Sequence, residues 1–490
     1  MRKLMVALVV ILWSLTARAE LPTHGFTLDN GLKVLIREDH RAPVVTVMVW
    51  FKAGSFDEAP YETGLAHVLE HMMFKGTERL GPGDFSKLVA RYGGSDNAFT
   101  SYDYTAYFQQ YEVSRLPLAL ELEAERLGNL KIDDDEFHRE LQVVLEERRT
   151  RTDDNPNALA WEKFQAVARP GTGYAHPIIG WRSLLAQLQP EQARSWYDRF
   201  YVPGNATLVV AGDVTRDQVE PLVRRFFSNL PAGTTPPRPT QTVTPPAGER
   251  RLDLAMAVQV PALYMLYNVP SLVTAEQKED FYALTMLAGV LDGGMSARIE
   301  TELVRGEKLV AGAGASYSGI QRGDGTFTLT ATPNPGVTLD QVEQALREQI
   351  KTLQSTLPSE DEMARVQAGV LASQVFEKDS VMGQAMELGM LSTLGLDIDL
   401  ADQFEEQLGK VTAEDAVTRN DGSRGGGADA QRLYQLSDDG KTGGGQRAPG
   451  AAAGYSILAD RAGCQGHVRA KRCLAHAGYS SGDGGGQFPG

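Results

Sequence analysis

A proline-rich stretch near the middle of the 490-residue chain divides it into two halves that carry the same pattern of strands and helices. Prolines recur from Pro231 to Pro246, and this composition favours a semi-rigid linker. On each side of it, β-branched runs with alternating polarity are interleaved with runs of helical periodicity. Because each copy of such a plan needs its own core, we predict two similar α/β domains, over 20–229 and 251–415, joined by a linker over 230–250.

The two halves can be compared element by element. In the first half we predict strands over 32–37, 44–51, 97–100, 104–109 and 206–212. Helices are predicted over 82–92, 116–127, 134–151, 190–201 and 216–227. The second half repeats the plan, with strands over 252–260 and 263–269, a hairpin over 310–317 and 325–331, and helices over 276–291, 339–353 and 359–394.

The first half also contains a short motif, His67-x-x-Glu70-His71, within a run that has helical periodicity. One helical turn separates the two histidines, so their rings can converge on one point, and Glu70 lies beside them on the same face. Two imidazoles and a carboxylate can form a metal site with a base next to it, and the order is the inverse of the H-E-x-x-H zinc-protease motif. The alternative is a pair of core histidines that are ion-paired with Glu70.

The predicted helix over 134–151 offers a third ligand. Glu140 and Glu147 are seven residues apart, so two helical turns place both carboxylates on one stripe beside two valines. A catalytic zinc site needs three protein ligands and one open position, and a glutamate from a second helix would complete the set. Glu146 and Glu147 are adjacent, so only one of them can face the site. Glu147 lies seven residues after Glu140, on the same stripe, and we therefore choose Glu147 as the third ligand. The alternative is a solvated acidic face that pairs with the arginines beside it, Arg148, Arg149 and Arg151.

The first 19 residues have the pattern of a secretory signal peptide. Arg2 and Lys3 precede an apolar run over 4–15, and Ala17-Arg18-Ala19 is a small-residue cleavage site. We predict cleavage after Ala19 and a protein that is periplasmic or otherwise exported; the alternative is an uncleaved anchor. The apolar run is too short for a stable membrane span, and no later stretch reaches the length of about 20 apolar residues that spanning requires.

The composition excludes one class of partner and one kind of stabilisation. The net charge is −15, so the chain has no basic face with which to neutralise the phosphates of a nucleic acid. The two cysteines of the sequence, Cys464 and Cys473, both lie near its C-terminus. Disulfides therefore do not hold the two predicted domains together.

The character of the sequence changes abruptly after Asp415. In the first half, a helix that opens at Gln189 leads to the strand over 206–212, whereas the similar opening at Val411 is followed by no predicted strand. Residues 416–490 are rich in glycine and poor in patterned apolar residues, so they cannot bury enough surface to become ordered. We predict a disordered tail, which is either natural or the product of a reading-frame change, and a second domain that lacks its closing strand.

Several motifs together resemble the M16 zinc metallopeptidases, the pitrilysin and mitochondrial-processing-peptidase-like family, and match its short bacterial branch best. The resemblance extends from about residue 25 to about residue 415. It implies an α+β fold in which two duplicated domains, each an antiparallel-rich sheet packed with helices, form a clam-like enclosure with one catalytic and one inactive half. The motifs that carry it are His67-x-x-Glu70-His71, Glu140, Glu147, Gly93-Gly94-x-x-Asn97-Ala-x-Thr100 and Tyr197-x-x-Phe200-Tyr201-x-Pro203-x-Asn205.

The resemblance also implies the chemistry of the site. One zinc ion would be held by His67, His71 and Glu147, with Glu70 as the general base and Glu140 positioning a ligand. The family binds its peptide as an added strand on a sheet edge. That edge would be formed here by Asn97, Ala98, Phe99 and Thr100, although Asn97 is also typical of a turn after two glycines. Two histidines and a carboxylate could hold iron as well, but the base beside them favours hydrolysis with zinc.

Two positions of the second half depart from the family pattern. Many members carry an Arg and, seven residues later, a Tyr that hold the substrate backbone, whereas Val304 and Ala311 stand at these positions here. We therefore expect a zinc endopeptidase that cleaves peptides or small unfolded polypeptides as the zinc-bearing subunit of a heterodimer, with a homologous subunit supplying the Arg/Tyr pair. The alternative is a non-catalytic peptide-binding or assembly subunit of an M16-like complex.

Overall fold

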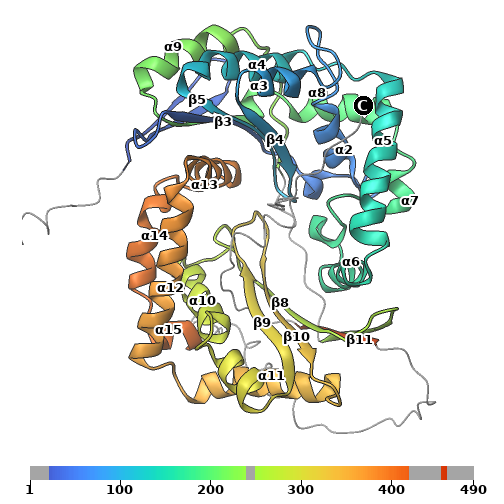
Figure 1. Ribbon diagram of the computed structural model, residues 1–490, viewed down its shortest axis with the longest axis vertical. Helices are drawn as coiled ribbons and strands as arrows, with labels where there is room; N and C mark the ends of the chain where they lie inside the picture. The colour runs from blue at the N-terminus through green and yellow to red at the C-terminus, as the bar shows by residue number, and fades with distance from the viewer. Residues whose placement is uncertain (1–20, 239–248, 419–453, 461–490) are drawn as a thin grey trace, which may run out of the picture.

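The computed structural model describes residues 21–238, 249–418 and 454–460. Each half of the chain forms one sheet with its own helices, and both halves are α+β, as predicted. Figure 1 shows the first half in blue to green and the second in yellow to orange. The predicted signal peptide and residues 239–248 of the predicted linker lie outside the described residues. None of the described helices is both long and apolar enough to cross a membrane.

The first sheet has six strands in the order β1-β2-β6-β3-β5-β4. All neighbouring strands are antiparallel except β2 and β6, which are parallel. Strand β4 therefore forms one edge of the sheet and pairs with a single described neighbour, β5. The strands are β1 (Thr23–Thr27), β2 (Lys33–Glu38), β3 (Val44–Phe51), β4 (Ser95–Thr100), β5 (Thr105–Glu112) and β6 (Ala206–Gly212).

Helices follow the strands of the first half in nearly the predicted order. The predicted helix over 134–151 ends earlier as an α-helix, because the chain continues into a wider π-helical turn, Arg149–Asp153. The helices are α2 (Leu65–Met72), α3 (Asp84–Arg91), α4 (Leu116–Gly128), α5 (Asp134–Arg148), α6 (Pro156–Ala168), α7 (Arg182–Leu185), α8 (Pro190–Phe200) and α9 (Arg216–Phe227), with short 3-10 turns at Ser55–Asp57, Val113–Arg115, Gly173–Ala175 and Pro203–Asn205.

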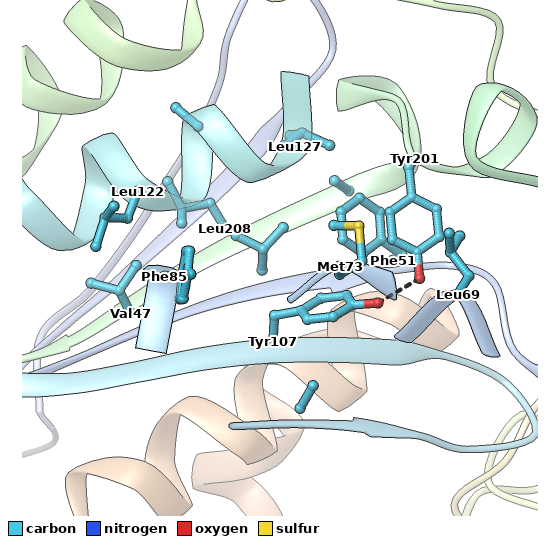
Figure 2. Packing of buried hydrophobic residues seen from close by; sticks show 14 of the residues in the cluster. Val47, Phe51, Leu69, Met73, Phe85, Tyr107, Leu122, Leu127, Tyr201 and Leu208 are labelled. Atoms are coloured by element: carbon cyan, nitrogen blue, oxygen red, sulfur yellow. Dashed lines mark hydrogen bonds between the residues drawn. The ribbon is translucent and has the colours of Figure 1, made fainter. Parts of the chain in front are cut away.

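The main core lies between the first sheet and its helices, and Figure 2 shows part of it. Phe51 on β3 stacks on Tyr201, with ring centroids 4.0 Å apart. The hydroxyl groups of Tyr107 and Tyr201 lie 2.9 Å apart, so each buried polar group has a partner. Leu69 and Met73 pack into the same cluster. This packing fixes the apolar side of the helix that carries the histidine motif.

The second sheet has five strands in the order β7-β11-β8-β10-β9. Its core is separate from that of the first sheet and is formed with α10, α11 and α12. The strands are β7 (Arg250–Ala255), β8 (Leu263–Val269), β9 (Val310–Ser318), β10 (Gly325–Pro333) and β11 (Gly454–Asp460). The helices are α10 (Glu279–Asp292), the π-helical turn Ile299–Gly306, α11 (Leu339–Ser355), α12 (Glu360–Asp379), α13 (Val381–Leu394), α14 (Leu400–Gly409) and α15 (Ala413–Thr418).

Strand β11 differs from the sequence-based expectation. We predicted that the second domain lacks a closing strand, but Gly454–Asp460 pairs antiparallel with β7 and parallel with β8. The backbone groups of β7 and β8 need partners, and this segment contains a short run of strand-favouring residues, including Tyr455 and Ile457. Residues 416–418 of the predicted tail belong to helix α15, and the remainder, 419–453 and 461–490, lies outside the described residues.

A second difference concerns the long helix predicted over 359–394. The structure breaks it at Ser380, whose side chain accepts the Gly383 N–H and caps a new helix, α13. Although α13 belongs to the second half by sequence, it packs against β3 and β6 of the first sheet. A Cβ atom at Gly389 would lie 2.1 Å from the Trp50 indole, so the helix can approach the sheet this closely only with glycine there.

The hairpin loop between β9 and β10 also contacts the first half, at the turn between β4 and β5. Arg322 Nη1 donates to Asp57 Oδ1 at 2.7 Å, and the Arg322 backbone N–H donates to Asp103 Oδ2 at 3.0 Å. Gly323 N–H donates to the Tyr174 hydroxyl at 2.8 Å, which in turn donates to Asp103 at 2.9 Å. A buried polar junction therefore joins the two halves next to the end of edge strand β4.

Glu387 on α13 predicts a pH dependence of stability. Burial raises its pKa from 4.5 to about 7, and the nearby cations Lys378 and Arg37 offset only part of this effect. Because the folded state holds this proton more tightly than the unfolded state, the group lowers stability progressively as the pH rises from about 4.5 to about 7. Glu387→Gln is expected to stabilise the protein at pH 8 by about 2 kcal/mol, and by little at pH 5. Urea unfolding at both pH values tests this, and an equal gain at both would contradict it.

Candidate metal centre

Helix α2 places the three residues of the histidine motif. Its apolar side is fully buried against the first sheet, so the polar side is held in a fixed direction. His67 and His71 are one turn apart, and their ring centroids lie 4.8 Å from each other. The helical spacing therefore brings the two imidazoles together, as predicted.

Helix α5 lies against α2 and brings the carboxylate of Glu147 to both rings. Glu147 Oε2 lies 3.3 Å from His71 Nε2, and Glu147 Oε1 lies 3.9 Å from His67 Nε2. One ligand atom from each of the three residues falls within 4.8 Å of the others, and no other group in the described part of the chain meets this criterion. Glu146 instead points to the surface and pairs with Arg149. Both observations agree with the sequence-based choice of Glu147.

Glu140 occupies the other side of His71. Its Oε1 lies 2.8 Å from His71 Nδ1, and its Oε2 lies 2.6 Å from Lys75 Nζ. A hydrogen bond at Nδ1 fixes the orientation of the ring and leaves Nε2 directed towards Glu147. The structure thus places Glu140 behind His71, in contact with a candidate ligand.

Burial and neighbouring charges shift the pKa values of the three clustered residues in different directions. Burial, with repulsion from His71, lowers the pKa of His67 to about 3, so this ring is neutral at physiological pH. Burial also opposes the charge of His71, but its bonds to Glu140 and Glu147 outweigh burial and raise the pKa to about 9. The pKa of Glu147 is lowered to about 2, because the two histidines outweigh the burial that opposes its charge.

Glu70 faces the same site from α2 but stands apart from the three clustered residues. Burial raises the pKa of Glu70, and the Thr100 hydroxyl, which donates to Glu70 Oε2 at 2.5 Å, partly offsets that rise. A buried carboxylate with a raised pKa is closer to the value at which a general base works best near neutral pH. Its position and its environment both suit that role.

The four residues predicted to bind substrate all lie on edge strand β4. Asn97 is exposed, and its Oδ1 accepts the Ala98 N–H at 2.8 Å. Phe99 is buried and packs edge-to-face against Trp50, so its side chain belongs to the core between the sheet and α13. Thr100 contacts Glu70 directly. The strand therefore ends at the site, and its outer edge pairs with no strand in the described part of the chain.

The two atypical positions of the second half lie in the π-helical turn Ile299–Gly306 and in β9. Val304 is partly buried there, whereas Ala311 is exposed. Neither side chain can donate a hydrogen bond.

Asn205, which begins a glycosylation-like triplet, is fully buried and is therefore not accessible to that modification in the folded protein.

Sequence reasoning missed several contacts of the site. Lys75 is ion-paired with Glu140, which sequence reasoning did not predict, whereas the ion pair of Arg151 with Glu147 is one that the acidic-face alternative names. The Arg151 pair follows the four-residue helical spacing, whereas Lys75 lies beyond the end of α2 and meets Glu140 on another helix, which spacing along one helix does not indicate. Thr100 is 30 residues from Glu70 in sequence, and no local signal predicts their contact.

The comparisons with known proteins agree with this geometry. Residues 33–180 match the family described as Insulinase (Peptidase family M16), and residues 187–370 match the family described as Peptidase M16 inactive domain. The zinc protease PqqE of Helicobacter pylori is 32% identical over 386 residues, covering 77% of this chain and 86% of that protein. An uncharacterized zinc protease of Streptomyces coelicolor is 26% identical, covering 80% of this chain and 86% of the relative.

Solved structures share the fold over most of the chain. A protease from Helicobacter pylori superposes with a TM-score of 0.73 at 25% sequence identity, covering 90% of this chain and all of that one. A peptidase M16 inactive domain from Pseudomonas fluorescens superposes with a TM-score of 0.71 at 17% identity, which supports the fold alone. The two family matches together span most of both halves, and one relative is one-third identical over most of its length. This chain therefore belongs to the M16 peptidase family.

Proposed function

We propose that the chain is a zinc-dependent endopeptidase that hydrolyses peptides or small unfolded polypeptides. The observation that carries the proposal is the convergence of His67, His71 and Glu147 within 4.8 Å, with Glu70 beside them. The donor set fits zinc: Nε2 of His67 and Nε2 of His71 both face Glu147, the bond from Glu140 at Nδ1 orients the His71 ring, and Glu147 supplies one carboxylate. Relatives that carry the name zinc protease support the same metal.

Each residue of the site has a distinct task in this proposal. Bound zinc would activate a water molecule and polarise the scissile carbonyl. Glu70 takes the proton of the attacking water at its carboxylate and later passes it to the leaving amine. Thr100 holds the Glu70 carboxylate in place through its hydroxyl. Glu140 keeps the His71 ring in the orientation that hydrolysis requires.

Strand β4 offers the place where the peptide would bind. It is an edge strand, so its outer backbone groups can pair with an extended peptide. At Ala98 the peptide would replace the Asn97 Oδ1 that accepts the backbone N–H. Its last residue, Thr100, contacts Glu70, so a peptide paired along β4 would run past the proposed base. Backbone pairing would give broad affinity, and neighbouring side chains would add selectivity.

We further propose that a homologous M16 subunit completes the site. The support is chemical: Val304 and Ala311 lack the donors that hold the substrate backbone in many M16 members. The same two residues support the second candidate function, a non-catalytic peptide-binding or assembly subunit. Export to the periplasm remains part of the proposal and rests on the leader-like sequence over 1–19.

One experiment separates the two candidates. Metal content is measured together with cleavage of a quenched-fluorescence peptide library, for the chain alone and with a homologous M16 subunit. About one zinc per chain, with cleavage that needs the second subunit, is the expected result. Zinc without cleavage under either condition would favour the binding subunit, and a chain that takes up no metal would overturn the proposal.

Glu140→Gln tests the role of the residue behind His71. The amide keeps the shape of the side chain but loses the charge that pairs with the ring and with Lys75. We expect the dissociation constant for zinc to rise about 10- to 100-fold while the fold is retained. Competition with a chelator of known affinity measures this. The matched control is Glu146→Gln on the same helix, since Glu146 pairs only with surface Arg149, and an equal loss in both variants would contradict the assignment.

A further inference from the structure

Glu58 is buried next to the start of the helix that carries the histidine motif. Its side chain has no exposed surface. Oε2 accepts the backbone N–H of Gly64 at 2.9 Å, and Oε1 accepts the backbone N–H of Ala66 at 2.8 Å. These are among the N–H groups that have no partner within a helix. One carboxylate therefore caps α2 from outside the helix, and its charge also suits the positive end of the helix dipole.

No residue of the helix terminus itself can take over this function. The N-cap position is Gly64, which has no side chain and adopts φ +93°. A Cβ there would lie 2.6 Å from the carbonyl oxygen of Ile179, so a Ser, Thr, Asp or Asn cap would not fit. Gly180 packs just as closely on the other side, with a Cβ position 2.2 Å from the Thr63 carbonyl. The packing that excludes a local cap leaves Glu58 to supply one.

His176 holds the Glu58 carboxylate from a third segment of the chain. Its Nε2 lies 3.3 Å from Glu58 Oε2 and 2.8 Å from the Ser55 carbonyl oxygen. A buried carboxylate needs such a partner to offset its desolvation. Because Ala66 immediately precedes His67, a shift of the capped terminus moves the first candidate ligand with it.

We propose that Glu58, held by His176, is a positioning residue of the metal centre: it fixes the start of α2 so that His67 stands at the correct distance from His71 and Glu147. This inference rests on the proposed zinc site. It adds that the affinity for zinc depends on a carboxylate that is not a ligand and does not touch one. Metal sites tolerate only small errors in ligand position, so loss of the cap lowers affinity even when the three ligands are intact.

The test compares Glu58→Ala with Glu62→Ala in the full chain. Glu62 lies in the same segment, but its side chain contacts Gln192 and bonds to no backbone N–H of α2. The first readout is the dissociation constant for zinc, from competition with a chelator. The second is amide hydrogen exchange at Gly64 and Ala66 in the metal-free protein. For Glu58→Ala we expect about a tenfold or greater rise in the dissociation constant and faster exchange at both amides, with no such change for Glu62→Ala.

A core variant separates positioning from a general loss of stability. Val223→Ala creates a cavity in the same domain core, on α9, a helix that packs against α4 and β2. If Glu58→Ala does not fold, the test uses Glu58→Gln instead. Its amide oxygen can still accept one of the two backbone N–H groups, so we expect a smaller rise in the dissociation constant than for Glu58→Ala. Equal changes in zinc affinity for the Glu58 variant and Val223→Ala, or unchanged exchange at Gly64 and Ala66, would overturn the inference. Wild-type chain that binds zinc but cleaves no peptide would instead overturn only the proposed hydrolysis.

Discussion

Glu70→Gln is expected to lower kcat/KM for peptide hydrolysis by about two to four orders of magnitude while the protein keeps its zinc. The amide has the same shape as the carboxylate and can still accept the Thr100 hydroxyl, but it cannot take a proton from water. Glu70 is not one of the three clustered residues, so zinc binding should survive. Because transition-state stabilisation is lost without loss of substrate contacts, the effect should fall on kcat more than on KM.

The measurement needs zinc content and cleavage rate on the same preparation. Glu146→Gln is the matched control, since it removes one glutamate carboxylate from an exposed ion pair near the site and is expected to leave the rate unchanged. A Glu70→Gln enzyme that retains most of its activity would show that another group acts as the base. Loss of zinc together with activity would show that Glu70 supports the metal rather than the water.

The candidate site was largely accessible from the sequence because its geometry is helical. A spacing of four residues brings His67 and His71 together on α2, and a spacing of seven places Glu140 and Glu147 on one side of α5. Spacing alone did not reveal that the two helices meet. The resemblance to M16 peptidases supplied that step, and the structure brings Glu147 to both histidines.

The parts that the sequence did not predict depend on tertiary contacts, some between segments far apart in sequence and some across a short loop. Thr100 meets Glu70 because strand β4 ends beside α2, and Glu58 meets Gly64 because the chain folds back within a tight loop. Periodicity indicates which face of an element is buried but does not identify what covers it. The break at Ser380 was missed although a polar run, Glu377-Lys378-Asp379-Ser380, ends there. Nothing in that run indicates that the second segment turns to cover the other half's sheet.

Asp103→Ala is expected to have the largest effect on stability, about 3 kcal/mol of unfolding free energy. Asp103 is 3% exposed and accepts bonds from the Arg322 backbone and the Tyr174 hydroxyl. Its removal leaves both donors buried without this acceptor, next to two guanidinium groups, those of Arg322 and Arg238. Asp57 still pairs with Arg322 at 2.7 Å, which keeps the cost at the lower end of the range for a broken buried ion pair.

Asp103→Asn separates the lost hydrogen bonds from the lost charge. Burial raises the pKa of Asp103 and outweighs the attraction of Arg322, so the charge itself is poorly stabilised and its removal should cost little. The amide oxygen can still accept from Tyr174, and we expect a loss of about 1 kcal/mol. Urea unfolding of both variants measures the difference. Equal losses would mean that the charge of Asp103, rather than its hydrogen bonds, holds the two halves together beside strand β4. A negligible loss for Asp103→Ala would mean that the packing of α13 on the first sheet is sufficient to hold the two halves together.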